Sequence, residues 1–77
     1  MHWNHRIVNC PSKNDGEDWY ECKEVYYDNF GIPISYTENP AKVHGETVEE
    51  IVVTLERMLK AASLPTLHED NFSHVFI

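Results

Sequence analysis

Long apolar runs are missing from this sequence, and cysteine and basic residues are scarce. No run approaches the roughly 18 apolar residues that a membrane-spanning helix needs, and the first ten residues contain no apolar stretch of signal-peptide length. Two cysteines are too few for a disulfide framework. These absences predict a soluble, cytoplasmic protein that makes no contact with a membrane.

Positive charge is the scarcest property: six Lys and Arg residues stand against 13 Asp and Glu, for a net charge of -7. Because holding a nucleic-acid backbone requires clustered Lys and Arg, we expect no direct binding of nucleic acid. A negative surface suits a partner protein with a basic surface, including one that itself binds nucleic acid. Such a surface also keeps a small protein in solution, whatever its function.

The length of 77 residues predicts one small domain over 1–77, with 63–77 as a C-terminal tail. A chain this short buries only about 60% of its unfolded surface, so we expect a thin core. Pro65 stops the preceding helix, and Leu64 and Leu67 are expected to fold back onto the core. The apolar end at 74–77 leaves three alternatives: a short strand, a contact between subunits or a frayed terminus.

Three stretches have the composition of β-strands. They cover 5–9 (HRIVN), 19–28 (WYECKEVYYD) and 32–38 (IPISYTE), with a polar loop at 11–18. The turn at 28–31 begins with Asp28 and ends with Gly31, which suits a type I turn closed by a left-handed glycine. Pro33 cannot donate a ladder hydrogen bond, so we expect the third strand at a sheet edge.

The register of the second hairpin leaves two alternatives for the buried face. In the first, Gly31 forms a bulge and Tyr26 lies near Ile34. In the second, the loop is a plain four-residue turn and Val25 lies opposite Ile34, which exchanges the two faces. The turn residues favour the first register, whose face would contain Tyr20, Cys22, Glu24 and Tyr26.

The clearest helix pattern begins at Thr47. Thr47 and Glu50 match a capping box, in which the carboxylate reaches back to the backbone, and Glu49 suits the positive end of the helix dipole. Apolar residues then recur every three or four positions, so one continuous stripe is expected to cover one face of the sheet. This stripe consists of Val48, Ile51, Val52, Leu55, Met58, Leu59 and Ala62.

Together these elements predict an α+β fold: a three-stranded antiparallel β-meander with one amphipathic helix packed on one face, in the order β-β-β-α. The other face would present aromatic side chains to solvent, to the tail or to a second subunit. A single thin layer with open strand edges also favours a homodimer, formed through the sheet or through the helix.

Six residues form the predicted partner-binding site. Glu24 lies on the face that the bulged register buries, near Tyr36, where its carboxylate suits an arginine of a partner. Solvent exposure, or pairing with Arg6 or Lys23, would explain this glutamate as well. Tyrosine is favoured at protein interfaces, and the glutamates at the helix start add negative charge. The site comprises Glu24, Tyr26, Tyr36, Glu46, Glu49 and Glu50.

No pattern in the sequence predicts a catalytic, metal or cofactor site. The histidines show no His-Glu-x-x-His spacing, and His2 and His5 would point to opposite faces of a strand. Cys10 and Cys22 lie several residues out of step across the first hairpin, too far apart for a disulfide. We therefore expect neither an enzyme nor a bound cofactor.

The helix start at 45–50, Gly45-Glu46-Thr47-Val48-Glu49-Glu50, follows the predicted third strand. It resembles the Gly-[Asp/Glu]-Thr-x-Glu-Glu stretch that opens the helix of HicB-like antitoxin domains. The resemblance implies a small antitoxin-like protein. The sequence has no appended helix-turn-helix or ribbon-helix-helix motif, so the operator binding common in that family is not implied.

Three hypotheses for the function follow. The first is a non-catalytic, antitoxin-like or inhibitor-like module that covers a basic surface of a partner protein. The second is a phage-type anti-defence protein, comparable to a CRISPR inhibitor, that imitates nucleic acid with its acidic residues. The third is a domain with a small-ligand or metal site.

Overall fold

The computed structural model describes residues 2–72. In chain order they form β1 (His2–Asn9), η1 (Pro11–Lys13), β2 (Tyr20–Tyr27), β3 (Pro33–Tyr36), α1 (Val48–Ser63), β4 (Leu67–His68) and η2 (Glu69–Asn71). The fold is the predicted α+β arrangement: β1, β2 and β3 form an antiparallel meander, and α1 packs on β1. The short β4 extends the sheet by pairing with β1 in parallel.

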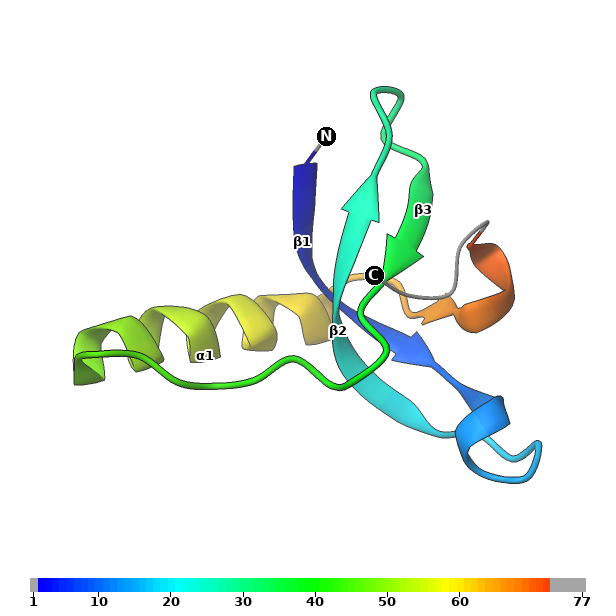
Figure 1. Ribbon diagram of the computed structural model, residues 1–77, viewed down its shortest axis with the longest axis horizontal. Coiled ribbons are helices and arrows are strands. Elements are labelled where there is room, and N and C mark those ends of the chain that lie inside the picture. The colour runs from blue at the N-terminus through cyan, green and yellow to red at the C-terminus, as the bar shows by residue number, and fades with distance from the viewer. Residues whose placement is uncertain (1, 73–77) are drawn as a thin grey trace.

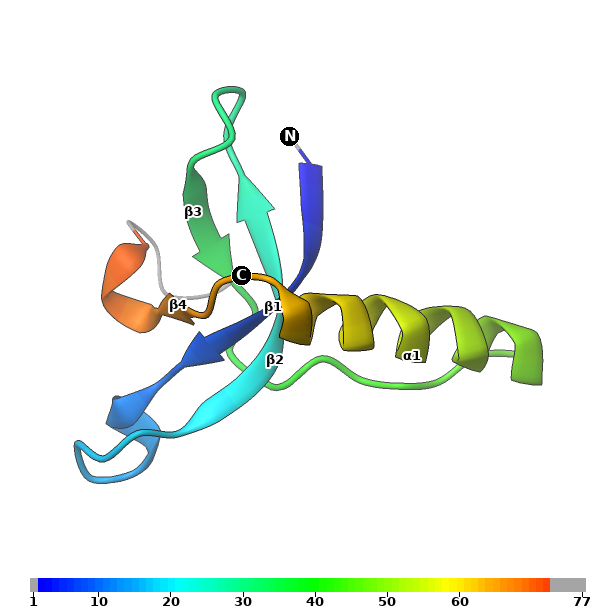
Figure 2. The same ribbon diagram turned by 180° about the vertical axis from the view of Figure 1, so that it is seen from behind.

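The sheet is strongly curled, with β1 and β2 bending along their length (Figure 1). Its strand order, β3-β2-β1-β4, places β3 at an edge, as Pro33 predicts. Figure 2 shows β4 next to β1, shortly after the end of α1. β1 is three residues longer than predicted and starts at His2, whose ring stacks on that of Tyr27 at 4.8 Å.

The core lies on one face of the sheet, which we call the inner face. Val8 and Val25 on this face are completely buried. The cluster consists of Val8, Cys10, Val25, Tyr27 and Tyr36, with Leu67 and Phe72 packed against it. Leu67 therefore folds back onto the core, as predicted, whereas the apolar end at 74–77 lies outside the described residues.

The turn between β2 and β3 forms as predicted. Gly31 adopts the left-handed conformation, with φ at 77°, and its N–H donates to the Asp28 carbonyl at 3.1 Å. The Asp28 carboxylate accepts two further backbone hydrogen bonds within the turn, at 2.8 and 3.0 Å. The predicted register holds as far as the pair Tyr27–Pro33.

One pair further along, the prediction of the buried face is wrong. Tyr26 pairs with Ser35 rather than with Ile34, because β3 contains one extra residue, a β-bulge, at this point. Since a shift of one residue exchanges the two faces of a strand, Val25 lies opposite Tyr36 in the core. The side chains that were predicted to face the core lie on the other face, the outer face: Tyr20, Cys22, Glu24 and Tyr26.

α1 begins where the capping chemistry predicts. The Thr47 hydroxyl accepts a hydrogen bond from the Glu50 N–H at 3.2 Å, and the Glu50 carboxylate accepts one from the Glu46 N–H at 2.7 Å. The C-terminal end of α1 lies against β1, whereas its N-terminal end projects far from the strands (Figure 1). The helix therefore does not cover a whole face of the sheet, and on the inner face it is Leu67 and Phe72 that pack against the core.

Candidate functional site

α1 carries two stripes of side chains that run next to each other along its length. The first is turned toward the rest of the chain, is buried or half-buried, and consists of Ile51, Thr54, Met58 and Ala61. The second, which we call the exposed stripe, consists of Val48, Val52, Leu55, Leu59 and Ala62. The sequence predicted most of these residues as one buried face, but only the first stripe is covered.

The exposed stripe is accessible to solvent over the whole length of the helix. The exposed fractions are 72% for Val48, 50% for Leu55 and 75% for Leu59. The stripe residues are spaced alternately four and three positions apart, which is the spacing by which one helix packs against another in a coiled coil. Single exposed apolar residues are ordinary, but a continuous row of them indicates an interaction surface.

Charged side chains border this stripe. Glu49, Glu56 and Lys60 each follow a stripe residue by one position, so two carboxylates and one ammonium lie along the same edge of it. Glu49 was predicted as a partner-binding residue, and the structure places it beside the stripe. Glu46 is exposed just before the helix, while the carboxylate of Glu50 is engaged in capping.

The other predicted partner-binding residues lie on the sheet, on opposite faces. Glu24 and Tyr26 are half-buried on the outer face, and the Tyr26 hydroxyl donates to the Glu24 carboxylate at 2.9 Å. Burial raises the pKa of Tyr26, and the neighbouring Glu24 adds to this shift. Tyr36 is only 4% exposed, and burial raises its pKa to about 12. Tyr36 therefore belongs to the core rather than to a surface that a partner contacts.

A buried ion pair on the inner face was not predicted. The Lys23 side chain is completely buried, and its Nζ lies 2.9 Å from the Glu21 carboxylate. Lys13 approaches the same carboxylate at 3.2 Å. Burial favours a higher pKa for Glu21, but the hydrogen bonds from Lys23, Trp19 and Lys13 outweigh it and lower the pKa to about 2. The charge of Glu21 is thus used within the fold.

Other acidic residues between 15 and 50 also have internal roles. The Asp18 carboxylate accepts a hydrogen bond from the Asn9 side chain at 3.0 Å, Asp28 holds the turn, and Glu50 caps the helix. Imitation of nucleic acid requires a regular row of charges that face outward. The internal use of these carboxylates therefore weakens that hypothesis.

Cysteines and metal ligands show no reactive arrangement in the described part of the chain. Cys10 and Cys22 are both free thiols, and burial raises the pKa of each, so neither is a thiolate at neutral pH. Within 2–72, no three His, Cys, Asp or Glu side chains are grouped so that they could hold a metal ion. The same residues include no helix with the length and hydropathy that crossing a bilayer would require.

No family model, curated protein or solved structure matches this chain. The resemblance to HicB-like antitoxin domains therefore stays a prediction. The helix start that carries the resemblance does form, with Thr47 as its cap, but caps of this kind also open helices in unrelated proteins.

Proposed function

We propose that this protein is a non-catalytic binding module, antitoxin-like or inhibitor-like, whose exposed stripe takes up an amphipathic helix of a partner protein with basic flanks. The exposed stripe is the observation that carries this proposal. Its aliphatic side chains are of the kind that proteins usually bury. A partner helix laid along the stripe would remove them from water, at about 25 cal/mol for each Å² of apolar surface covered.

Charge favours a basic partner over a second copy of this chain. In an antiparallel pair of α1 helices centred on the stripe, the two Glu56 side chains would face each other. In a parallel pair, the N-terminal ends of the two helices would lie side by side, and with them the Glu46 and Glu49 side chains of both copies. The antiparallel pair would also bring Lys60 near the acidic helix start of the other copy, but both arrangements join chains that each have a net charge of -7. Lysine or arginine along the partner's flanks would replace this repulsion with attraction.

Two synthetic helical peptides test the proposal. Both have a leucine seam spaced four and three residues apart, and they differ only in having lysine or glutamate at the flanking positions. We expect the lysine-flanked peptide to bind, with an affinity that falls as salt is added, and the glutamate-flanked peptide not to bind. Fluorescence anisotropy of labelled peptides measures both affinities.

Val52 and Val53 offer a matched pair of variants. They are consecutive and are 45% and 46% exposed, but only Val52 lies on the exposed stripe. Val52→Asp should weaken binding by at least about tenfold, or about 1.4 kcal/mol, because it places a charge in the apolar contact. Val53→Asp should change the affinity by less than about twofold.

Three outcomes would contradict the proposal. Equal binding of the two peptides would show that charge does not select the partner. Equal effects of the two aspartate variants would show that the partner does not bind along the exposed stripe. Sedimentation velocity on the protein alone provides the third. A dimer that Val52→Asp dissociates would show that a second copy, rather than a basic partner, occupies the stripe.

A further inference from the structure

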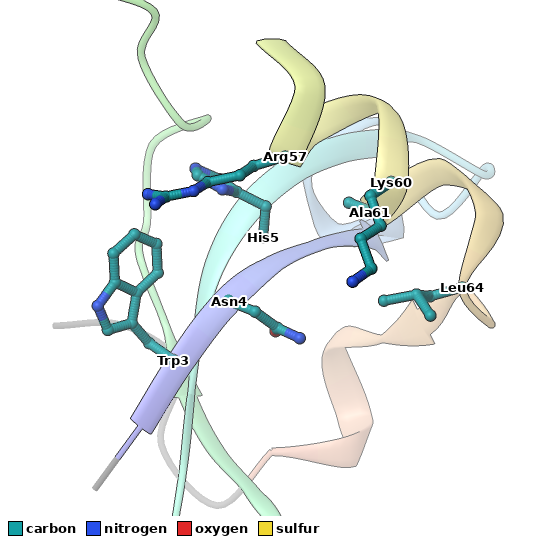
Figure 3. Close-up of a pocket in the computed structure, with 7 residues that line it drawn as sticks. All are labelled: Trp3, Asn4, His5, Arg57, Lys60, Ala61 and Leu64. Atoms are coloured by element: carbon teal, nitrogen blue, oxygen red, sulfur yellow. The ribbon is translucent and has the colours of Figure 1, made fainter. Parts of the chain in front are cut away.

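A cavity of about 390 Å³ lies between β1 and the C-terminal half of α1 (Figure 3). Trp3 and His5 line it from the strand, and Arg57 and Lys60 line it from the helix. Its volume falls in the range of sites that hold small organic molecules. None of the exposed-stripe residues lines it, so the cavity is a separate surface from the one proposed above to bind a partner.

Two cationic side chains border the cavity, and neither has an acidic partner within the described part of the chain. Arg57 and Lys60 lie one helical turn apart, and both are exposed. Neither takes part in the ion pairs formed by residues 2–72, although the chain contains 13 acidic residues. In Figure 3, the Arg57 guanidinium extends past His5 toward Trp3, and Lys60 points toward the side of Asn4. Two uncompensated cations around one cavity favour an anionic ligand.

His5 adds hydrogen-bonding capacity to the wall of the cavity. It is only 8% exposed, and its Nδ1 atom has no hydrogen-bond partner among residues 2–72. A buried polar atom without a hydrogen-bond partner reduces the stability of a fold by about 1–3 kcal/mol. A ligand that forms a hydrogen bond with Nδ1 would explain why this atom is tolerated. Burial lowers the pKa of His5, with Arg57 adding to the shift and Glu24 opposing it. Burial therefore favours the neutral imidazole, and Arg57 and Lys60 provide the positive charge.

Trp3 supplies a flat aromatic surface beside these groups. Its side chain is 45% exposed. The indole meets the His5 ring edge-on at 5.4 Å and lies 6.4 Å from the Tyr26 ring. An indole that two neighbouring rings hold in place, and that keeps an open surface, suits stacking against a planar ring of a ligand.

We propose that this cavity binds a phosphate ester of a planar aromatic ring, with the chemistry of a nucleoside monophosphate. Arg57 and Lys60 are long, exposed side chains that can both turn to the phosphate, while the ring stacks on Trp3. Two positive charges match a phosphate dianion, whereas a carboxylate would leave one of them uncompensated. A single nucleotide needs only this local charge, unlike a nucleic-acid strand, which requires an extended basic surface.

Adenosine 5′-monophosphate is the probe, titrated into a Trp19→Phe protein in which Trp3 is the remaining tryptophan. Stacking of the adenine ring should quench the fluorescence of Trp3. We expect a Kd below about 1 mM, which calorimetry would measure independently. Adenosine has the ring but no phosphate group, and inorganic phosphate has no ring. Each should therefore bind at least about tenfold more weakly than the nucleotide. Indole-3-acetate tests the carboxylate: if it binds more tightly than the nucleotide, the phosphate assignment is overturned.

Charge variants distinguish binding in the cavity from a general effect of the protein's net charge on nucleotide binding. Arg57→Gln and Lys60→Gln should each weaken nucleotide binding by at least about tenfold. Lys42→Gln removes the same charge outside the cavity and should change the Kd by less than about twofold. All three side chains are exposed, so thermal unfolding should show that the variants still fold. Absence of binding at millimolar nucleotide, or equal losses in all three variants, would overturn the proposal.

Discussion

The inner face of the sheet and the exposed stripe of α1 contain similar residues in opposite surroundings. Val25 on the sheet is completely buried, whereas Val48 on the helix is 72% exposed. The inner face even encloses a charged lysine, Lys23, because Glu21 compensates it. The stripe is apolar, yet no described residue covers it. The difference indicates that the buried contacts of the sheet stabilise the fold, whereas the exposed stripe, which stays in contact with water, contributes little to its stability.

The largest expected effect comes from breaking the ion pair of the inner face. Glu21→Gln keeps the shape of the side chain but leaves Lys23 buried without a carboxylate. We expect the free energy of unfolding to fall by about 3 kcal/mol, because an uncompensated buried charge is strongly destabilising. Urea unfolding measures this loss, and Glu17→Gln, at an exposed position, should change the value by less than about 0.5 kcal/mol.

The same ion pair predicts a characteristic dependence of stability on pH. The pKa of Glu21 is about 2 in the folded protein, below its ordinary value of 4.5. Since the folded value is the lower one, the carboxylate stabilises the protein fully above pH 4.5 and loses this contribution as the pH falls toward 2. Glu21→Gln should flatten this part of the profile. An identical slope in the variant and the parent protein would contradict the assignment.

The comparison is sharpened by making one substitution in both regions. Val25→Ala should cost about 2 kcal/mol, because it leaves a cavity in the core. Val52→Ala should change stability by less than about 0.5 kcal/mol, since its side chain is already half exposed and alanine favours the helix. Denaturant unfolding of both variants measures the difference. Equal losses would mean that the stripe is a structural part of the fold.

The smallest expected effect is confined to the helix start. Thr47→Ala removes the cap and should cost about 1 kcal/mol locally. Because the N-terminal half of α1 projects from the sheet (Figure 1), its first turn should show faster amide hydrogen exchange while β2 is unchanged. Thr66→Ala, at an exposed position after the helix, is the control. Equal acceleration in β2 would show that the helix and the sheet unfold as one unit.

Local chemistry predicted those parts of the fold that a few neighbouring atoms determine. The cap at Thr47, the left-handed Gly31 and the edge position of Pro33 all follow from backbone hydrogen bonds and sterics. The buried face of β2 could not be predicted in this way. The extra residue at Ile34 shifts the pairing by one position, and no residue type in β3 predicts a bulge there. The burial of Lys23 likewise depends on tertiary contacts. The presence of a charged residue in a strand does not predict such contacts.

The candidate sites were predicted less completely than the fold. The sequence indicated Glu49 at the helix start, and the structure places it beside the exposed stripe. The spacing of apolar residues indicated the stripe itself, but such spacing shows only that a face is apolar and not what covers it. Trp3 and His5 of the cavity lie on β1, whereas Arg57 lies on α1, more than 50 positions later. Only the packing of α1 on β1 brings Arg57 to the other two.

Arg6 joins the helix to the sheet. Its guanidinium donates to the Tyr27 hydroxyl at 3.1 Å and to the Pro65 carbonyl at 2.5 Å, directly after α1 ends. With 16 residues, the helix is about 24 Å long, and a tilt of about 10° at Arg6 would move its far end by about 4 Å. A partner bound along the exposed stripe would therefore exert torque on β1 through a long arm. The cavity beside Trp3 lies close to the pivot, where the same rotation changes its width.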